Sequence, residues 1–369
     1  MHDAIVVGAG VVGAAVADAL TAEGASVLVI EAHFPASGAT GAGMGHIVVM
    51  DDSPAQLALT ALSRDIFDDI SAELPPSCEL DRCGTLWIAS NDEELAVASR
   101  KAERCIAAGV AAVMLDAAAL ADAEPNLRTG LAGAVHVPGD SVVYPPALCT
   151  FLLGRATSRG AQVIRDTPVL RIEPHAVVTR DGRHEADVIV NAAGLHAPQL
   201  TPGLPILPRR GHLVITDRHP GFCRHQLVEL GYMRSAHTMT AESVAFNVQP
   251  RRTGQVLVGS ARELTEDSAI NRDIVARMLR RAAEFMPRIG ELTAIRTWTG
   301  VRPATEDKLP LIGAWSAVAG LWIAAGHEGL GITTALGTAR ILVDLLHDRT
   351  PPIDARPFAA ARVVAAAGT

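Results

Sequence analysis

The first stretch of the chain constrains its fold most strongly. An apolar run at residues 4–7 leads directly into the glycine-rich segment GAGVVG at residues 8–13. A helical pattern follows at residues 14–23, and a second apolar run at residues 26–30 ends in Glu31. Strand, glycine turn, helix, strand and acid follow one another in the order of a nucleotide-binding βαβ unit. The sequence therefore predicts a Rossmann-like parallel sheet that begins at the N-terminus.

The glycines of this segment each have a physical task in binding a dinucleotide. Gly8 permits the tight turn, Gly10 lets a pyrophosphate approach the backbone, and Gly13 allows the helix to pack closely on the sheet. The helix N-terminus offers unpaired N–H groups and the positive end of its dipole. Glu31 stands where a carboxylate accepts hydrogen bonds from ribose hydroxyls, which argues against the 2′-phosphate of NADP. An incidental glycine turn would have to match all these features by accident, but the motif does not separate FAD from NAD.

Size and composition exclude several classes of protein. The 369 residues, 49% hydrophobic and 20% charged, predict two domains or one domain with a large insertion. A net charge of −8 without a basic block argues against a nucleic-acid partner. The five scattered cysteines form no CxxC pair, so we expect no metal site and a reducing compartment. With no leader before the first strand and no apolar run of membrane-spanning length, we expect a cytoplasmic protein without a transmembrane segment.

The hydrophobic patterns along the chain predict an α/β fold, α+β overall, with interleaved domains. Helices are expected at residues 54–74, 92–108, 116–123, 147–159, 273–285 and 332–346. Strands are expected at residues 83–89, 133–137, 161–165, 169–173, 177–180, 187–191, 293–301 and 320–325, with a hairpin turn at 181–182. Four more strands, 211–216, 226–230, 243–248 and 255–259, predict an antiparallel sheet. We expect residues 1–80, 145–205 and 306–369 to form a dinucleotide-binding domain and residues 81–144 and 206–305 to form a substrate domain.

Small residues dominate the segment ASGATGAGMGH at residues 36–46. It shows no helix or strand period, and it carries less charge than an ordinary surface loop. Such a segment lets the backbone pass close to a flat ligand. We therefore expect it to lie against the bound cofactor.

A second glycine-rich turn near the C-terminus repeats the logic of the first. The strand at 320–325 is followed by Gly326, Gly329 and Gly331, which open a helix. The N-terminal dipole of that helix would stabilise negative charge on the ring of a reduced flavin. A NAD dehydrogenase has no need of a C-terminal segment that returns to the cofactor. This second turn therefore favours FAD over NAD.

Taken together, these motifs resemble the family of flavoproteins that contains glycine oxidase, sarcosine oxidase and D-amino acid oxidase. The resemblance covers nearly the whole chain and rests on five segments: IVVGAGVVGAAVA with Glu31, ATGAGMG, VNAAG at 190–194, TGVRPATEDKLPLIG at 299–313 and AAGHEGLGIT at 324–333. The run GATGAGMGHIVVMDD is most similar to the flavin subunits of opine oxidase, D-hydroxyproline dehydrogenase and hydrogen cyanide synthase.

The resemblance implies a Rossmann-like FAD-binding domain, an antiparallel substrate domain and roles for particular residues. Arg302 matches the arginine that binds the substrate carboxylate, although from the residues alone it could equally pair at the surface with Glu306 or Asp307. No cysteine stands near Arg302 to tether the flavin, so non-covalent FAD is expected. The implied cofactor-binding residues are Gly8, Gly10, Val12, Gly13, Glu31, Ala32, Thr40, Gly43, Met44, Gly45, Val169, Ala193, Gly194, Arg302, Gly329, Leu330, Gly331, Ile332 and Thr333.

The chain departs from this family at two places. Asn247 stands where glycine oxidases carry a tyrosine, three residues before Pro250. No lysine or histidine lies at residues 243–247 to help oxygen react, which favours a dehydrogenase that passes electrons to another acceptor. With Arg302 and Asn247, the candidate catalytic residues are His46 and His327, either of which could instead be structural. We expect Glu328 to support its loop, and Tyr144 and Tyr232 to serve packing.

Three functions stay open at this stage. The first is FAD-dependent oxidation of the C–N bond of a small amino or imino acid, such as a D-amino acid, a D-proline or hydroxyproline, or an N-alkyl amino acid. Hydride transfer to the flavin would leave an imine that water hydrolyses. The second is a flavin-carrying subunit that needs partner chains. The third is an enzyme of the same fold with a non-amine substrate. In each case we expect an oligomer.

Overall fold

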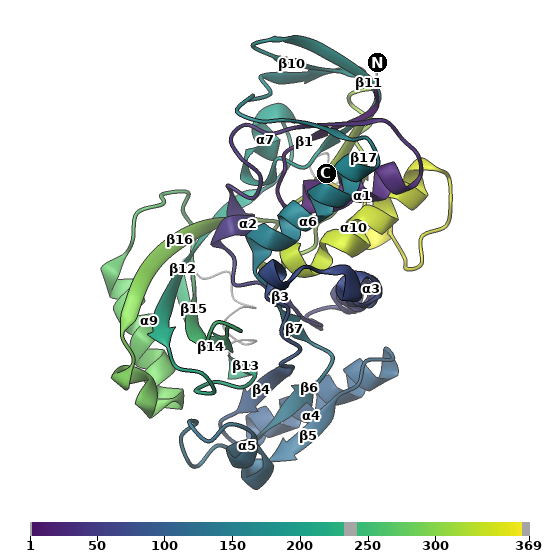
Figure 1. Ribbon diagram of the computed structural model, residues 1–369. Helices are drawn as coiled ribbons and strands as arrows, with labels where there is room; N and C mark the ends of the chain where they lie inside the picture. The colour runs from purple at the N-terminus through teal and green to yellow at the C-terminus, as the bar shows by residue number, and fades with distance from the viewer. Residues whose placement is uncertain (1, 232–241, 364–369) are drawn as a thin grey trace.

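The computed structural model describes residues 2–231 and 242–363, and two eight-stranded sheets organise them (Figure 1). Tyr232, for which the sequence favours a packing role, and residues 364–369 lie outside the described residues. A small third sheet pairs β3, His46–Ile47, with β7, Ser141–Val142.

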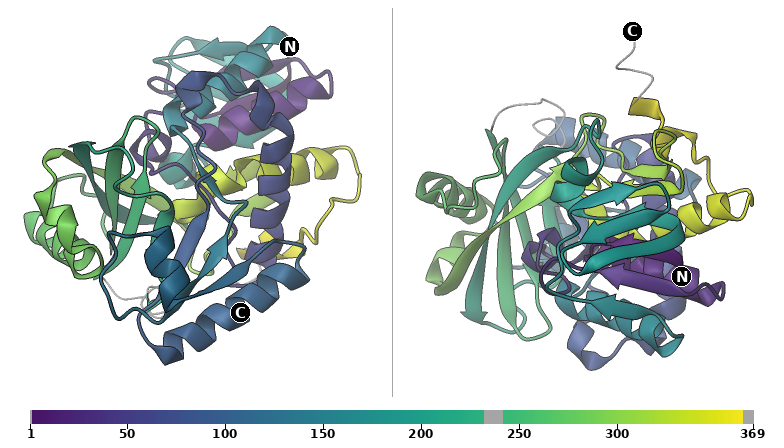
Figure 2. Two further views of the ribbon diagram at one scale, coloured as in Figure 1. Left: turned by 60° about the horizontal axis from the view of Figure 1, so that its bottom comes forward. Right: turned by 90° about the horizontal axis from the view of Figure 1, so that it is seen from above.

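The first sheet joins segments from the start, the middle and the end of the chain. Its strands lie in the order β17-β18-β11-β1-β2-β8, and β10 and β9 extend β11 as a meander. All neighbours from β18 to β8 are parallel, while β17 is antiparallel to β18. In both views of Figure 2 the purple, teal and yellow parts of the chain meet in this region. The bounds are β1 His2–Val7, β2 Val27–Ile30, β8 Gln162–Ile164, β9 Arg171–Glu173, β10 Ala176–Thr179, β11 Gly182–Asn191, β17 Leu311–Ala314 and β18 Leu321–Ala325.

The two faces of this sheet are buried against different layers. Because side chains alternate along a strand, Val6 of β1 belongs to one hydrophobic cluster, and Ile5 and Val7 belong to another. Helices α1, α6, α10 and α3 cover the face of Val6 (Figure 1). Val177 of β10 and Ala197 of α7 pack on the other face. The helix bounds are α1 Val11–Ala22, α3 Pro54–Ile70, α6 Pro145–Ser158, α7 Ala197–Leu200 and α10 Gly331–Leu346.

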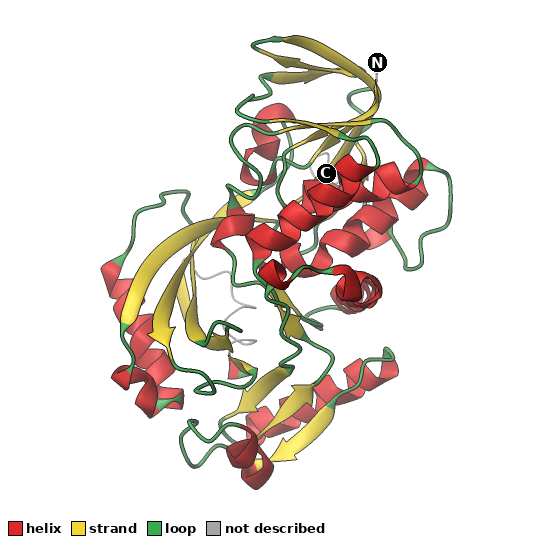
Figure 3. Ribbon diagram, in the orientation of Figure 1, coloured by secondary structure: helices red, strands yellow, loops and turns green. Residues whose placement is uncertain are grey.

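The second sheet is strongly curved, and α9, Arg272–Phe285, lies on its outer side (Figure 3). Phe246 of β14 stacks on Phe285 of α9 with 4.4 Å between ring centroids. Helix α4, Asp92–Ala107, packs on β4 and β6, and α5, Ala117–Ala123, packs on β5 and β6. The strand order is β16-β12-β15-β14-β13-β4-β6-β5. The bounds are β4 Thr85–Ala89, β5 Val113–Asp116, β6 Gly133–Val137, β12 Leu207–Arg218, β13 Gln226–Glu229, β14 Glu242–Pro250, β15 Gln255–Glu263 and β16 Ala294–Ala304.

Each helix and strand expected from the sequence is present, although several boundaries differ. Helix α1 begins at Val11 rather than at residue 14, and α6 begins at Pro145 because proline fits the first turn of a helix. The strand expected at 187–191 is the end of one long strand, β11. The four strands expected to form an antiparallel sheet, β12, β13, β14 and β15, do pair antiparallel, and the sheet continues from β13 to β4, which runs parallel to it.

Several elements were not predicted. The segment expected to lack regular structure contains a single helical turn, α2, Ala39–Ala42, which is too short to show a helical period. Strand β5 is largely exposed and so lacks an apolar pattern, and β3, β7 and β17 are only two to four residues long. Short 3₁₀ turns complete the described chain at η1 Ser71–Glu73, η2 Pro76–Cys78, η3 Gly194–His196, η4 Pro287–Glu291, η5 Glu328–Leu330 and η6 Arg356–Phe358.

One described stretch, Glu328–Leu346, is long and apolar enough by composition to cross a membrane, which the sequence analysis did not anticipate. More than half of its apolar window, 56%, is buried inside the protein. Ala335, Ala339 and Leu342 of this stretch belong to the cluster that covers the first sheet. Packing within the fold therefore accounts for its apolar character.

Candidate active site

A cavity of about 800 Å³ has walls from both large sheets. Nearly all the predicted site residues lie in its wall, which they reach from eight separate segments of the chain. Gly13 and Thr333 are the two predicted residues that do not. The predicted residues in the wall are Gly8, Gly10, Val12, Glu31, Ala32, Thr40, Gly43, Met44, Gly45, His46, Val169, Ala193, Gly194, Asn247, Arg302, His327, Gly329, Leu330, Gly331 and Ile332.

The N-terminal glycine turn forms one end of the cavity. Gly8 has a φ of 101°, and a Cβ atom there would lie 2.7 Å from the carbonyl oxygen of Ala192. Gly13 lies behind the wall, where a Cβ atom would collide with the carbonyl of Gly8, so this position must be glycine for α1 to pack on β1. Helix α1 has no acidic residue in its first turn, and Gly10 at its N-cap offers no side chain. The backbone therefore presents a positive helix end to an anion in the cavity.

Glu31 follows β2 and is fixed at the same end. One carboxylate oxygen accepts a hydrogen bond from the Ala9 N–H at 2.7 Å, and the other accepts from the His33 N–H at 2.9 Å. Each carboxylate oxygen has a second lone pair, so Glu31 can also accept from hydroxyl groups in the cavity. This arrangement fits the ribose of a dinucleotide.

A second helix N-terminus faces the cavity from α10. Leu330, at its N-cap, provides no side-chain cap, and the first turn carries no acid. Thr333 ties this helix to β3, since its hydroxyl donates to the His46 carbonyl at 2.9 Å. At Gly43 a Cβ atom would lie 2.8 Å from Ile332 Cδ1, so the small residues of the 36–46 segment do allow close approach to α10. Two positive helix ends thus point at one cavity.

Arg302 reaches the cavity from β16. Its Nη1 donates to the Ala261 carbonyl at 3.0 Å, and its guanidinium lies directly over Gly211 of β12, where a Cβ atom would be 2.5 Å from Nη2. A surface ion pair of Arg302 with Asp307 was the alternative for this acid. The Asp307 carboxylate instead binds Arg362, with 2.8 Å between Oδ2 and Nε. The structure therefore places Arg302 in the wall of the cavity. Its guanidinium occupies a position that any side chain at residue 211 would block.

A second arginine beside Arg302 was not predicted. Arg262, on β15, forms an ion pair with Glu328 of η5, with 2.9 Å between Nε and Oε1. Burial by itself would raise the pKa of Glu328, but the charges of Arg262 and Arg302 lower it to about 2. Glu328 also accepts from the Gly329 N–H at 2.8 Å and so holds its loop, as the sequence suggested. No sequence motif marks Arg262, because its partner is 66 residues away.

The two candidate histidines differ in their surroundings. His327 is 5% exposed, and its Nε2 lies 3.0 Å from the Thr338 hydroxyl, so a structural role accounts for it. Burial lowers the pKa of His327 to about 3. Burial likewise lowers the pKa of His46 to about 4, so both rings are neutral at pH 7. Within the described chain, Nε2 of His46 is buried without a hydrogen-bond partner, which leaves it available to a ligand.

Five buried polar atoms of the cavity wall lack a hydrogen-bond partner among the described residues. Because buried polar groups are nearly always paired in folded proteins, such atoms indicate a polar ligand. They belong to His46, Asp52, Trp87, Gln226 and Asn247. A polar group that binds along this wall would satisfy them.

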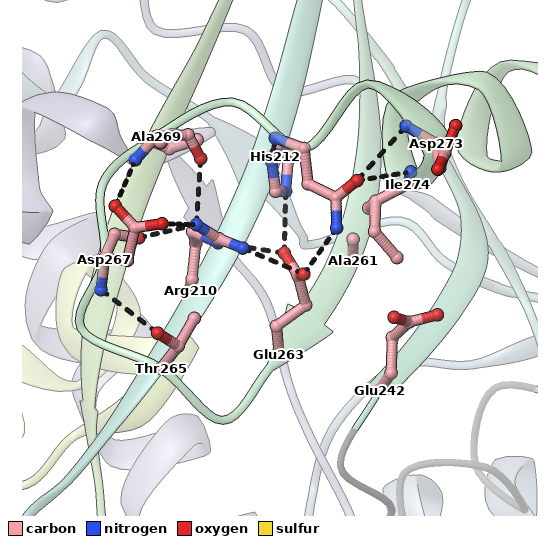
Figure 4. A network of polar contacts seen from close by, with 12 residues as sticks. Arg210, His212, Glu242, Ala261, Glu263, Thr265, Asp267, Ala269, Asp273 and Ile274 are labelled. Carbon is pink, nitrogen blue, oxygen red and sulfur yellow. Dashed lines mark hydrogen bonds and ion pairs between the residues drawn. The ribbon is translucent and has the colours of Figure 1, made fainter.

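An ion-pair network on β12 and β15 supports the arginine end of the site (Figure 4). Arg210, next to Gly211, binds both oxygens of Glu263 at 2.9 Å, and Glu263 follows Arg262 in the chain. Asn271 Nδ2 donates to the same carboxylate at 3.0 Å. Bidentate arginine–carboxylate pairs are strong and directional, so they fix the two strands that carry Gly211 and Arg262.

Other side chains named from the sequence lie outside the site. Tyr144 is 38% exposed and stacks under Arg251, with 4.9 Å from its ring centroid to the guanidinium carbon, so packing is its role. In the part of the chain that the structure describes, no group of three or more His, Cys, Asp or Glu residues could hold a metal ion.

The fold and the cavity are those of a dinucleotide-binding oxidoreductase. The N-terminus of a second helix, α10, faces the cavity, as a flavin ring would require. The family model described as FAD dependent oxidoreductase matches residues 3–345, and the chain belongs to that family. FAD is therefore its cofactor, and the Rossmann-like fold class predicted from the sequence is confirmed. The glycine cradle, Glu31 and the two helix ends fit such a cofactor.

Two of the similar proteins are named for amino acids as their substrates. The chain is 28% identical to a glycine oxidase of Geobacillus kaustophilus, with 100% of this chain and 98% of that protein covered. It is 30% identical to a D-amino acid dehydrogenase of Cereibacter sphaeroides, with 83% and 71% covered, and 27% identical to the hydrogen cyanide synthase subunit HcnC of Pseudomonas aeruginosa, with 84% and 75% covered. The crystal structure of the Geobacillus kaustophilus glycine oxidase superposes with a TM-score of 0.87 at 27% identity, covering 98% of both chains. The protein is accordingly an FAD-dependent oxidoreductase of amino acids or amines.

Proposed function

We propose that this enzyme oxidises the C–N bond of a small amino or imino acid: a D-amino acid, a proline or hydroxyproline of D configuration, or an N-alkyl amino acid. The observation that carries the proposal is the position of Arg302, whose guanidinium shares one cavity with the two helix N-termini that suit the cofactor. A planar guanidinium binds a carboxylate through two parallel hydrogen bonds.

The residues of the chain would act by binding and orienting the substrate. FAD, when bound, supplies the hydride acceptor. Arg302 would hold the substrate carboxylate, and the amide oxygen of Asn247 would accept a hydrogen bond from the amine. His46 is neutral at pH 7 and would accept a second hydrogen bond at Nε2, from substrate or cofactor. The imine that leaves the site is hydrolysed by water. Positioning of this kind supplies much of the catalytic effect when a cofactor carries the chemistry.

The cofactor residues are proposed in the roles that the sequence implied. Gly8, Gly10 and Glu31 would bind the ADP half of FAD, and Gly329 to Ile332 would meet the pyrimidine end of the flavin. Gly13 and Thr333 would act from behind the wall, through helix packing and through the His46 carbonyl. No cysteine is among the residues of the cavity wall, which supports a non-covalent cofactor.

We also propose the domain division given above. All strands of the first sheet fall within residues 1–80, 145–205 and 306–369, and all strands of the second sheet fall within 81–144 and 206–305. The likeness to HcnC, which is named as a subunit, supports an alternative in which this chain needs partner chains to pass its electrons on. A cytoplasmic location and an oligomeric state remain predictions from the sequence.

Anaerobic flavin bleaching tests the proposal. The yellow protein is mixed without oxygen with D-amino acids, imino acids and N-alkyl amino acids, and the flavin absorbance is followed. We expect members of this panel to bleach the flavin. In Arg302→Ala, with FAD still bound, we expect bleaching to require much higher concentrations of the same compounds. Unchanged kinetics in that variant would remove Arg302 from the site. Copurifying chains, or activity with a dye but not with oxygen, would favour the subunit alternative, and flavin left in an acid precipitate would contradict non-covalent binding.

A further inference from the structure

A polar corner of the cavity, formed by Trp87 and Gln226, has no part in the reaction as proposed. Both side chains lie in the cavity wall, and each is only 2% exposed. The indole Nε1 of Trp87 and the amide Oε1 of Gln226 are buried without a hydrogen-bond partner in the described chain. One is a donor and the other an acceptor. Burying either group unpaired is costly, so the corner is built for a ligand that pairs with both.

The register of the second sheet places this corner beside the proposed substrate site. Trp87 of β4 is paired with Val228 of β13, and Val228 is paired with Asn247 of β14. Paired residues of neighbouring strands share a face, and so do residues two apart on one strand, which puts Gln226 on the same face. Neighbouring strands are about 4.8 Å apart, so the row from Asn247 to Trp87 spans about 10 Å between backbones.

The arginine end of the site is continuous with this row. The guanidinium of Arg302 donates to Ala261 on β15, the strand next to β14, and Asn247 is paired with Gly259 of β15. A substrate held at Arg302 that extended along the sheet past Asn247 would approach Trp87. Its far end would meet the Trp87–Gln226 corner only if it is longer than glycine.

The indole of Trp87 is held in place by a buried charge. Lys101 Nζ lies 4.1 Å from the centroid of the Trp87 ring, and the lysine side chain is fully buried. Lys101 is paired with Asp51, which also accepts from Nε of Arg104 at 2.8 Å. A cation on the ring face draws electron density from the indole, which makes its N–H a stronger donor. Lys101 thus acts as a positioning residue for a preorganised donor.

We propose that the Trp87–Gln226 corner binds a hydroxyl group on the substrate. This inference rests on the proposed function and narrows its substrate class to amino or imino acids that carry a hydroxyl beyond the reacting carbon. A hydroxyl accepts from the indole N–H and donates to the amide oxygen at the same time. An ammonium cannot accept from Trp87, and a methyl group can do neither. The corner therefore distinguishes a hydroxylated compound from its deoxy counterpart.

The test compares matched pairs in the FAD-loaded protein and in the Trp87→Phe variant, which keeps an aromatic ring over Lys101 and removes the N–H. The reactive pairs are serine against alanine and 4-hydroxyproline against proline, in both configurations, followed by anaerobic flavin reduction. The unreactive pair is 4-hydroxybutyrate against butyrate, followed by the change in the flavin spectrum on binding. Trp322→Phe, on β18 and outside the cavity wall, is the matched control.

We expect the hydroxylated member of each pair to be favoured by about tenfold in the wild type and in Trp322→Phe, as one buried hydrogen bond predicts. In Trp87→Phe the preference falls to within about twofold, with the deoxy compounds unchanged. The proposal would be overturned if the wild type treats the hydroxylated and the deoxy member of each pair equally, or if its preference for the hydroxylated member survives in Trp87→Phe. A different result would separate this proposal from the proposed function. If the wild type prefers 4-hydroxybutyrate to butyrate, Trp87→Phe does not, and no amine reduces the flavin, then the hydroxyl-binding role of the Trp87–Gln226 corner is upheld and the amine-oxidising function is refuted.

Discussion

Adding one methyl group under the substrate arginine tests the geometry of the site. In Gly211→Ala the new Cβ would lie 2.5 Å from Nη2 and 2.8 Å from Cζ of Arg302. An ordinary contact is about 3.5 Å, so the guanidinium must move by about 1 Å. It is the far end of a flexible side chain, and position 211 does not have a positive φ, so we expect the fold to tolerate the change.

We expect the Gly211→Ala substitution to weaken the binding of the substrate carboxylate. A charge-assisted hydrogen bond contributes about 1.5–3 kcal/mol, so misplacing this one weakens substrate binding by about 10- to 100-fold. Stopped-flow flavin reduction measures the substrate Kd, with FAD content and Tm recorded for each variant. The control is Gly290→Ala, where a Cβ atom would meet nothing within 4 Å. Suppose that Gly211→Ala binds substrate as tightly as the wild type while Arg302→Ala binds it weakly. The guanidinium of Arg302 would then not lie over Gly211 when it binds substrate, and the reasoning would be refuted.

Three further changes probe other parts of the structure. Lys101→Met leaves Asp51 buried with only its Arg104 partner, and we expect the free energy of unfolding in urea to fall by about 3 kcal/mol; a loss under 1 kcal/mol would contradict this. Glu31→Gln turns an N–H donor toward Ala9 or His33, so FAD should bind the apoprotein at least about tenfold more weakly, and an unchanged titration would refute the role of the acid. His327 has a folded pKa of about 3, below its unfolded value near 6.5, so only the unfolded chain takes up this proton as the pH falls from 6.5 to 4. The stability advantage of the wild type over His327→Gln should therefore shrink by about 1.4 kcal/mol per pH unit in that range, and a pH-independent difference would disprove it.

Local rules explain what the sequence could predict. The glycine turn at residues 8–13 and the acid at position 31 follow from contacts between neighbouring elements, and these residues lie where the motif places them. A long helix such as α3 carries its own apolar period and its own capping residue, since the Ser53 hydroxyl accepts from the Gln56 N–H at 3.1 Å. Such features depend on a few adjacent residues and can be read from the chain alone.

Contacts between distant segments explain what it could not. The ion pair of Arg262 with Glu328 and the burial of Lys101 under Trp87 join residues whose separation carries no motif. Strand β5 has largely exposed side chains, so no alternation marks it. The parallel pairing of β4 with β13 depends on the direction in which an early segment enters a sheet made of later ones. These features are decided by the assembled fold rather than by local preference.

The interleaved path of the chain sets the order in which the cofactor site can be completed. The glycine turn precedes Arg302, β18 and the N-terminus of α10 in the chain, and so it is synthesised before them. β1 lies between β2 and β11, and the end of β11 at residues 189–191 gains a neighbour on its other side only when β18 has been made. The nucleotide motif therefore lacks the opposite wall of its cavity until these later segments have been made. A nascent chain stalled before residue 321 would therefore lack β18 and the N-terminus of α10, and we expect it not to retain FAD.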